Sequence, residues 1–290
     1  MPVARFSYQG SKPRLGKVVD GNIIDLSEVL SGISPDVGAF LAAGESAIQV
    51  YRKLEANSVA QFSIDDVELL APIPKPEKLL AIGMNYQDHG REAQKLGVEL
   101  PEYQLWFNKQ VSCINDPHGD VVLPSVSEKL DYEVELAVVI GKPCRYVEVD
   151  AARKVIGGYM VANDVSARDW QMRSSTLTLG KSFDTHGPLG PWVTLDHEVD
   201  DPHQLALEMR INGDLRQSAT TNAMIHSIYE QIAYLSQVMT LRPGDILETG
   251  TPSGVGIAME PPVFLQPGDV MRAEIDGLGF IENKVVAETG

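Results

Sequence analysis

Three prolines stand at alternate positions, Pro72, Pro74 and Pro76, in the segment Ala-Pro-Ile-Pro-Lys-Pro. Each proline lacks a backbone N–H and fixes its own φ, so this segment opposes both a helix and a central strand. Alternating prolines instead favour an extended polyproline geometry. The chain of 290 residues is also at the size where single cores tend to divide. We therefore predict a linker between a small N-terminal domain, residues 1–70, and a larger domain, residues 71–290.

The N-terminal part combines both kinds of secondary structure. Short strand-like pieces at 2–8, 14–19 and 21–25 lead to a helical stretch, which Ser34 is predicted to cap with Pro35 in the first turn. Apolar residues recur at helical spacing through Phe40, Leu41, Ile48, Tyr51 and Leu54. A small α/β domain is the expected result.

The larger part is rich in strands. Its β-branched segments predict strands at 79–82, 121–123, 134–140 and 158–162. One amphipathic helix is indicated by Ile225, Ile228, Ile232, Leu235 and Met239. Pro-Gly-Asp occurs at 243–245 and at 267–269, each time before a strand-like run, and is typical of a turn. Because strands and helices do not alternate regularly, we expect an α+β fold rather than a doubly wound sheet.

Charge and cysteine content exclude several classes of function. The net charge is −16 and the sequence pI is near 4.7, whereas binding to a phosphate backbone needs a basic surface. No nucleic acid is therefore expected as a partner. No apolar run approaches the ~18 residues of a membrane helix, and the polar start of the chain does not resemble a signal peptide. The two cysteines, Cys113 and Cys144, form no CxxC pattern, which excludes a zinc ribbon and favours a reducing compartment. We expect a cytoplasmic protein.

Two glutamates open the predicted strand at 134–140. Glu133 and Glu135 are two positions apart, so in a strand they point to the same face. Asp164 closes another apolar strand and offers a third carboxylate. Such carboxylates repel one another unless a cation lies between them, and oxygen ligands favour Mg²⁺, Mn²⁺ or Ca²⁺ over zinc. The same spacing also occurs on solvated strand faces, so it predicts a metal site only as one of two interpretations.

His89 and Glu92 would share one face of a helix at a spacing of three residues. A carboxylate can then orient the imidazole as a general base. An incidental pair on a surface helix is the alternative. Gly83, Gly90 and Gly97 surround the pair and suggest a mobile lid over residues 88–96.

Gly180-Lys181-Ser182 resembles the end of a phosphate-binding loop, but Ser175 stands where that motif needs glycine. Lys181 is interpreted instead as a point charge for a substrate carboxylate or oxygen, with a solvated lysine as the alternative. The segment Thr-Gly-Thr-Pro-Ser-Gly-Val-Gly at 249–256 could bind an anion through its N–H groups or serve as a structural turn. His118 lies in a predicted loop and has no assigned role.

Five motifs occur in one order between Leu79 and Gly256: IGMNYQDHGREA, LDYEVELAVVIG, GYMVANDVSARDWQ, LGKSFDTHGPLGPW and LETGTPSGVG. Together they resemble those of the fumarylacetoacetate hydrolase superfamily. The resemblance implies a mixed β-roll with peripheral helices, a homodimer, and a divalent metal, Mg²⁺ or Mn²⁺ with Ca²⁺ as a third possibility. The implied site residues are the metal ligands Glu133, Glu135 and Asp164, the catalytic residues His89, Glu92 and Lys181, and the substrate-binding residues Arg168, Gln171 and Thr251.

The superfamily carries out several reactions on small 2-oxo carboxylates. We expect hydrolysis of a C–C bond in a β-diketo acid of the acylpyruvate or fumarylpyruvate type. The alternative is decarboxylation of oxaloacetate, or keto–enol or double-bond isomerisation as with a 2-hydroxy-diene-dioate, at the same site. Residues 172–179 are a few positions shorter than in many members, so the outer wall of the site is expected to differ.

Overall fold

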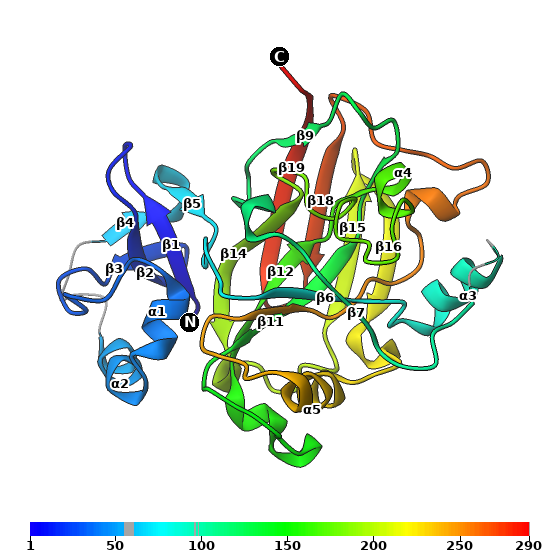
Figure 1. Cartoon of the computed structure of the whole chain (residues 1–290). Helices are drawn as coiled ribbons and strands as arrows, with labels where there is room; N and C mark the ends of the chain where they lie inside the picture. The colour runs from blue at the N-terminus through cyan, green and yellow to red at the C-terminus, as the bar shows by residue number, and fades with distance from the viewer. Residues whose placement is uncertain (55–60, 96, 98, 290) are drawn as a thin grey trace.

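The computed structural model describes residues 1–54, 61–95, 97 and 99–289. Strands at the N-terminus form one side of the molecule, and a thicker body of strands forms the rest (Figure 1). Residues 55–60 of the predicted N-terminal domain and residue 96 of the predicted lid lie outside the described part. None of the described helices is both long and apolar enough to cross a membrane.

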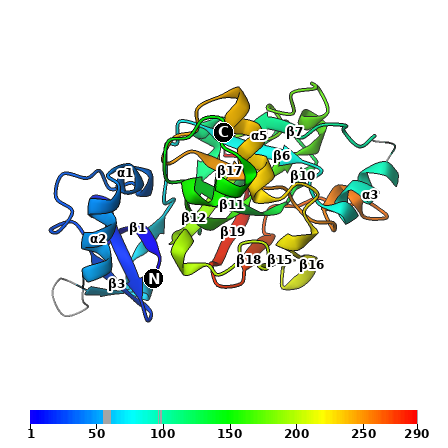
Figure 2. The same ribbon diagram turned by 90° about the horizontal axis from the view of Figure 1, so that it is seen from below.

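The N-terminal unit packs a small sheet against two short helices (Figures 1 and 2). The helical stretch is split at Gly44, whose φ of 73° interrupts the backbone. Its predicted cap at Ser34 is wrong, because the carboxylate of Asp36 accepts the Gly38 and Ala39 N–H groups instead. The elements are β1 (Val3–Ser7), β2 (Arg14–Val19), β3 (Asn22–Asp25), α1 (Val37–Ala42), α2 (Glu45–Lys53), β4 (Gln61–Ser63) and β5 (Glu68–Leu70).

In the part of the chain that the structure describes, the larger body contains most of the strands and three α-helices. The helix predicted from apolar spacing is α5, which begins after Ser227, where Ser227 and Glu230 form a capping box. Its strands are β6 (Leu79–Gly83), β7 (Leu105–Asn108), β8 (Ile114–Asn115), β9 (Val121–Leu123), β10 (Leu130–Asp131), β11 (Val134–Ile140), β12 (Ile156–Asn163), β13 (Ser166–Ala167), β14 (Gly187–Leu195), β15 (Ala206–Ile211), β16 (Asp214–Thr220), β17 (Ile246–Glu248), β18 (Val270–Ile275) and β19 (Gly279–Ala287). Its helices are α3 (Gln87–Lys95), α4 (Arg168–Gln171) and α5 (Ile228–Val238).

Two mixed sheets form the roll. The long sheet has the order β4-β3-β2-β1-β14-β12-β11-β17-β6-β7, and a five-stranded sheet has the order β16-β15-β18-β19-β9. Most pairs among the described strands are antiparallel, but β17 runs parallel to β6, β19 runs parallel to β9, and β14 runs parallel to β8. This architecture confirms the predicted α+β class. The Pro-Gly-Asp turns precede β17 and β18, with Gly244 at φ 88° and Gly268 at φ 104°.

Strand β11 lies at the centre of the long sheet and is buried along its whole length. Val134 and Val138 face the core shared with the five-stranded sheet, while Ala137 and Val139 belong to the core that α1 and α2 cover. Burial on both faces explains why this run is apolar without alternation. Glu135 interrupts it, so an ionisable side chain is placed inside the protein.

The proline segment at 71–76 contains neither helix nor strand, as its composition predicted. This segment is hydrogen-bonded to both parts of the molecule. The Ala71 N–H donates to Asp116 of the larger body, and the Pro72 carbonyl accepts the N–H of Val37 from the N-terminal unit. Strand β1 also pairs with β14 at Val3 and Val193. The N-terminal strands therefore continue the long sheet, and the division at residue 70 stays a prediction.

Candidate metal centre and active site

The three carboxylates predicted as metal ligands converge. Strands β11 and β12 pair with Val134 opposite Asn163. Glu133 and Asp164 are the next residues at this end of the strand pair, so they lie side by side. The Asp164 N–H donates to the Glu133 carbonyl at 2.9 Å and fixes this end of the pair. One oxygen from each of Glu133, Glu135 and Asp164 lies within 4.8 Å of the others, and all three side chains are buried. We call this group the acidic triad.

Two buried lysines partly neutralise the acidic triad. Lys181 Nζ donates to Glu133 Oε2 at 2.7 Å and also to Asp164 Oδ2. Lys109 Nζ donates to the other oxygen of Asp164 and to the His186 carbonyl. An ammonium group has three donors, so Lys181 retains one for a ligand. Lys181 is therefore a buried, ion-paired side chain rather than a solvated lysine.

The triad members differ in their tendency to ionise. Burial opposes ionisation of Glu133, but Lys181 and Arg168 outweigh it and hold the Glu133 pKa at about 2. Burial raises the pKa of Glu135 well above its ordinary value, and the charges of Asp164 and Glu248 raise that pKa further. Unlike Glu133 and Asp164, Glu135 forms no ion pair with a described lysine or arginine. A divalent cation with oxygen ligands fits this donor set.

His89 and Glu92 lie on α3 and face the triad. His89 Nδ1 is 3.4 Å from Glu92 Oε2, and the two side chains are 16% and 24% exposed. Glu92 also accepts the Gly254 N–H through both of its oxygens, at 3.1 and 3.2 Å. A carboxylate that is fixed to the backbone in this way can orient the imidazole.

The glycine-rich segment supplies backbone donors to the site. The Gly250 N–H donates to Glu135 Oε2 at 2.7 Å. Gly250 has φ 98°, and a Cβ there would lie 2.7 Å from the Asn85 Cβ, so this position needs glycine. The segment binds carboxylates of the protein itself, Glu135 and Glu92, and both predictions for it, anion binding and a structural turn, describe part of what it does.

Arg168 lies between the acidic triad and the cavity. Its Nη1 contacts Glu133 Oε1 at 2.6 Å and donates to Gln171 Oε1 at 3.0 Å, and its Nε donates to Asp131 at 2.9 Å. Its buried Nη2 has no partner among the described residues. Thr251 differs, because its hydroxyl already donates to the Val134 carbonyl and accepts from Gln217. Arg168 therefore has one unpaired donor, whereas the Thr251 hydroxyl is already paired and its side chain only forms part of the cavity wall.

These side chains surround a cavity of about 200 Å³. Apolar residues, among them Phe107, Leu105 and Val255, form the rest of its wall. Such a small cavity with a few convergent polar groups suits a small, polar ligand. The candidate residues that line it are His89, Glu92, Glu133, Glu135, Arg168, Gln171, Lys181 and Thr251. Asp164 lies beneath this wall and is fully buried.

Sequence reasoning gave no role to three residues of the site. Lys109 follows the apolar strand β7, Asp131 opens the motif that contains Glu133, and Glu248 ends the apolar strand β17. Asp131 holds Arg168 and accepts the Gly256 and Ile257 N–H groups. All three side chains are buried. For Lys109 and Glu248 the available signal was a charged residue at or just after the end of a short strand, and for Asp131 it was its position in the LDYEVELAVVIG motif.

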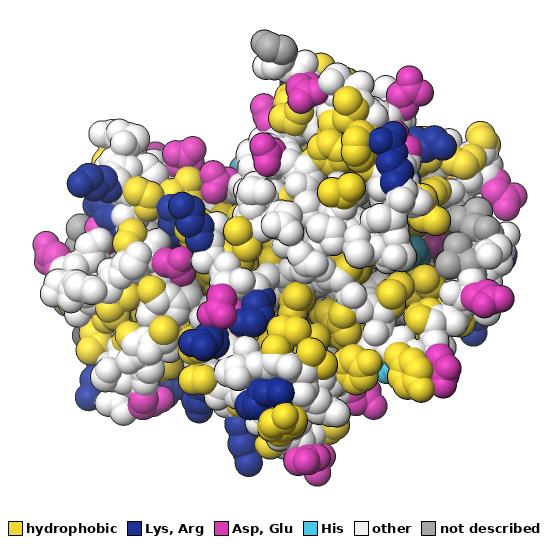
Figure 3. Space-filling model, in the orientation of Figure 1, with side chains coloured by type: hydrophobic (Ala, Val, Ile, Leu, Met, Phe, Trp, Pro, Cys, Tyr) yellow, Lys and Arg dark blue, Asp and Glu magenta, His cyan; other side chains and the backbone are white. Residues whose placement is uncertain are grey.

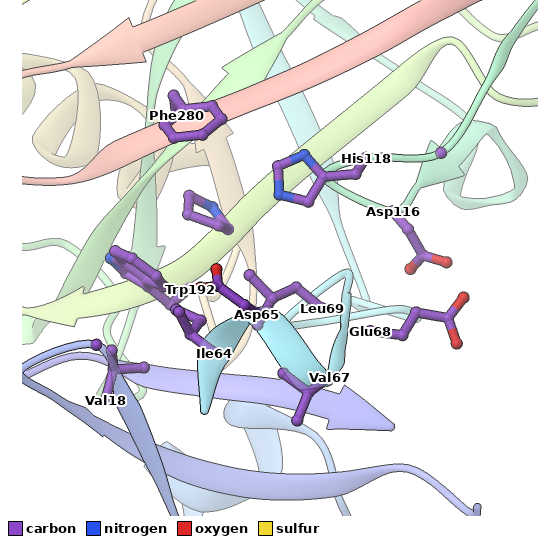
Figure 4. A pocket seen from close by; sticks show the side chains of 13 residues that line it. Val18, Ile64, Asp65, Val67, Glu68, Leu69, Asp116, His118, Trp192 and Phe280 are labelled. Atoms are coloured by element: carbon purple, nitrogen blue, oxygen red, sulfur yellow. The ribbon is translucent and has the colours of Figure 1, made fainter. Parts of the chain in front are cut away.

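A larger cavity, of about 670 Å³, lies elsewhere, between the N-terminal unit and the roll (Figure 4). Its lining is mostly apolar, with Trp192, Phe280 and His118 around it, and none of the candidate residues lines it. His118, to which the sequence assigned no role, packs near Phe280 with a centroid distance of 5.7 Å. Charged side chains of both signs are mixed on the face in Figure 3. We place the active site at the smaller cavity.

Comparisons with known proteins show which family this chain resembles. The family model described as "Fumarylacetoacetate (FAA) hydrolase C-terminal" matches residues 78–286. The chain is 44% identical over 268 residues to "Oxaloacetate tautomerase FAHD2B, mitochondrial" of Bos taurus, covering 92% of this chain and 84% of the relative. Maleylpyruvate hydrolase from Sphingobium sp. SYK-6, solved in complex with manganese (II) ion and pyruvate, has a TM-score of 0.82 at 34% identity over all of both chains. The isomerase of 2-hydroxyhepta-2,4-diene-1,7-dioate from Mycobacterium marinum has a TM-score of 0.78 at 31% identity, also over all of both chains.

One prediction is contradicted by these relatives. The oxaloacetate tautomerases of Bos taurus and Xenopus laevis are named mitochondrial, so the expected cytoplasmic location is wrong. The low cysteine content indicated a reducing environment, and this property does not separate one reducing compartment from another.

Proposed function

Because this chain belongs to the fumarylacetoacetate hydrolase family, as its five motifs indicated, we propose that it interconverts the keto and enol forms of a small 2-oxo dicarboxylate of the oxaloacetate class, with a divalent metal. The observation that carries the proposal is that Glu133 and Glu135 of the acidic triad, the His89 imidazole and the Arg168 guanidinium, which has one unpaired donor, line one cavity of about 200 Å³. The name of the Bos taurus relative supports this reaction over the C–C hydrolysis that we expected first.

Glu133, Glu135 and Asp164 would hold the metal. Mg²⁺ or Mn²⁺ suits three carboxylates, with Ca²⁺ as a further option, and the manganese in the Sphingobium hydrolase supports Mn²⁺. When bound, the metal supplies Lewis-acid polarisation of the 2-oxo group, which makes the neighbouring C3–H more acidic.

The protein's own residues bind the substrate and move the proton. Arg168 Nη2, free in the structure, would bind one substrate carboxylate, and Gln171 beside it would orient that group. His89, oriented by Glu92, would take a proton from C3, and the protonated imidazole would return a proton to the 2-oxo oxygen to give the enol. Lys181 would balance the negative charge that develops on that oxygen. Thr251 would shape the wall.

Hydrolysis of an acylpyruvate is the second candidate. The same His89–Glu92 pair could activate a water molecule instead of removing a C3 proton, and the Sphingobium neighbour is named a hydrolase. The two reactions differ in whether water is added and a C–C bond is broken. Decarboxylation of oxaloacetate is a third outcome at the same site, and it releases carbon dioxide.

A substrate panel separates these reactions. We would incubate the metal-loaded enzyme with enol oxaloacetate, maleylpyruvate and an acylpyruvate, and follow enol absorbance together with product masses. The proposal predicts rapid loss of enol absorbance with unchanged mass for oxaloacetate. Cleaved products from the other two substrates without any effect on oxaloacetate would favour hydrolysis. The homodimer expected of the family also stays part of the proposal, and sedimentation analysis would test it.

A further inference from the structure

Glu248 lies on the same face of the long sheet as the acidic triad. It ends β17, and the register of β17 against β11 places it directly opposite Ala137. Residues that face each other across a pair of strands project to the same side, and so do residues two positions apart. Glu248 is therefore a diagonal neighbour of Glu135: it lies opposite Ala137, which is two residues further along β11.

No hydrogen bond explains why a carboxylate is found at this depth. Glu248 has no exposed surface, and neither of its side-chain oxygens has a partner among the described residues. Removing a carboxylate from water without such partners is costly. Its charge acts on Lys109, and the charges of Asp164 and Glu133 act on it. The side chain thus interacts with the metal centre through charge alone.

A count of the buried charges shows what this carboxylate can do. Three buried cations surround the centre, Lys109, Lys181 and Arg168. Among the described residues, the buried carboxylates at this centre are Asp131, Glu133, Glu135, Asp164 and Glu248, five in all. When all are ionised, two negative charges remain without a counter-charge, which one divalent cation would balance. Without Glu248 a single negative charge would remain.

We propose that Glu248 is a positioning charge for the metal: it does not coordinate the ion but raises the affinity of the acidic triad for a divalent cation. The proposal rests on the metal site proposed above. Charges at this depth interact more strongly than at the surface, because little water screens them. The same charge repels the triad when no metal is bound. Glu248 thus strengthens metal binding at the expense of the stability of the metal-free protein.

Two opposite effects of one substitution test this inference. We would titrate the protein with Mn²⁺ and measure free Mn²⁺ by electron paramagnetic resonance. Glu248→Gln removes the charge at nearly constant volume and is expected to weaken Mn²⁺ binding at least ~10-fold. In EDTA at pH 9, where the Glu248 carboxylate is charged, the same variant should unfold at a higher temperature than the wild type, whereas damage to packing would lower it. Glu248→Asp keeps the charge and should bind Mn²⁺ within about threefold of the wild type.

Glu274→Gln is the matched control, since it removes a carboxylate that is 51% exposed on β18. It should leave both Mn²⁺ affinity and melting temperature unchanged. Wild-type affinity for Glu248→Gln, or weakening in Glu248→Asp equal to that in Glu248→Gln, would overturn the inference. A lower melting temperature of Glu248→Gln in EDTA, or its failure to fold, would also overturn it. Absence of Mn²⁺ binding in the wild type would instead refute the proposed metal site itself.

Discussion

Both side-chain oxygens of Glu92 accept the backbone N–H of Gly254, at 3.1 and 3.2 Å. This contact joins α3, which carries His89, to the glycine-rich segment that also donates to Glu135 through Gly250. Gly254 has φ 104°, and a Cβ there would lie 2.0 Å from the Arg216 carbonyl oxygen, so the turn that presents this N–H depends on glycine. One short segment therefore contacts both Glu135 of the acidic triad and Glu92, the partner of His89.

The Glu92 contact should determine how often α3 opens. Glu92→Ala removes a charge-assisted hydrogen bond that is partly exposed, so amide hydrogen exchange in residues 87–95 should become up to about tenfold faster. The control is Asp88→Ala, whose pair with Arg91 is 70% exposed on both sides and should contribute little. Unchanged exchange in Glu92→Ala would show that other contacts hold α3. Oxalate should slow the exchange in the wild type if α3 is the predicted lid.

His89 should affect turnover and leave metal binding intact. His89→Ala removes the proposed base, so interconversion of keto and enol oxaloacetate should slow by ~10²–10⁴. Mn²⁺ affinity should stay nearly unchanged, because the acidic triad remains complete. Glu92→Gln should have a smaller effect in the same direction, and Asp88→Asn, next to His89 on the exposed side, should have none. Turnover of His89→Ala at the wild-type rate would remove the base from the mechanism.

Arg168 should control substrate affinity. Arg168→Lys keeps one charge near Asp131 and Glu133 but removes the free Nη2 donor, so KM for oxaloacetate should rise about tenfold, the effect of one lost hydrogen bond to a charged group. The effect on kcat should be smaller. Steady-state kinetics at saturating Mn²⁺ measures both constants. A KM equal to that of the wild type would place the substrate carboxylate elsewhere.

The metal-free protein should lose stability as the pH rises. Burial raises the pKa of Glu248 to about 8, from an ordinary value of 4.5. Between these values the folded state binds more protons than the unfolded state, so the stabilising contribution, complete below pH 4.5, is lost as the pH rises through 8. In EDTA the melting temperature should fall by about 5 °C between pH 6.5 and 8.5. His186, whose pKa burial lowers to about 4, titrates below this window.

Two comparisons check the origin of this pH dependence. Glu248→Gln should show a flatter profile in EDTA, and saturating Mn²⁺ should flatten the profile of the wild type. A melting temperature that is constant or rises over this range in EDTA would contradict the assigned burial of Glu248. Calorimetry at each pH provides the measurement.

The sequence predicted the core of the fold because local pattern and burial agree there. Strands β9 and β11 have the bounds expected from their β-branched residues, and the carboxylates of β11 point as the two-residue period requires. The Ser34 cap failed because Asp36 competes for the same N–H groups from a better position. The pairing of β1 with β14 could not be predicted from the sequence for another reason. It joins residues 190 positions apart, and a local sequence pattern carries no information about such distant pairs.

The candidate site divides in the same way. Motif residues such as Glu133 and His89 were found through the resemblance, and the structure brings them to one cavity. Lys109 and Glu248 were missed because the residues around them come from strands that are distant in the sequence. Only the three-dimensional arrangement shows that Lys109 binds Asp164 and that the Glu248 carboxylate has no hydrogen-bond partner among the described residues. The cellular location could not be predicted from composition, because composition contains no targeting information.

Metal dependence of tautomerisation tests the central claim most directly. We would measure loss of enol oxaloacetate with the wild type in excess EDTA, after addition of Mn²⁺ or Mg²⁺, and with Glu135→Gln, which removes one member of the acidic triad. Our account predicts that EDTA abolishes the enzyme-dependent rate, that either ion restores it, and that Glu135→Gln remains at least ~10²-fold slower at the same Mn²⁺ concentration, because one carboxylate of the metal site is lost. Full tautomerisation by the wild type in excess EDTA, or by Glu135→Gln, would contradict the account.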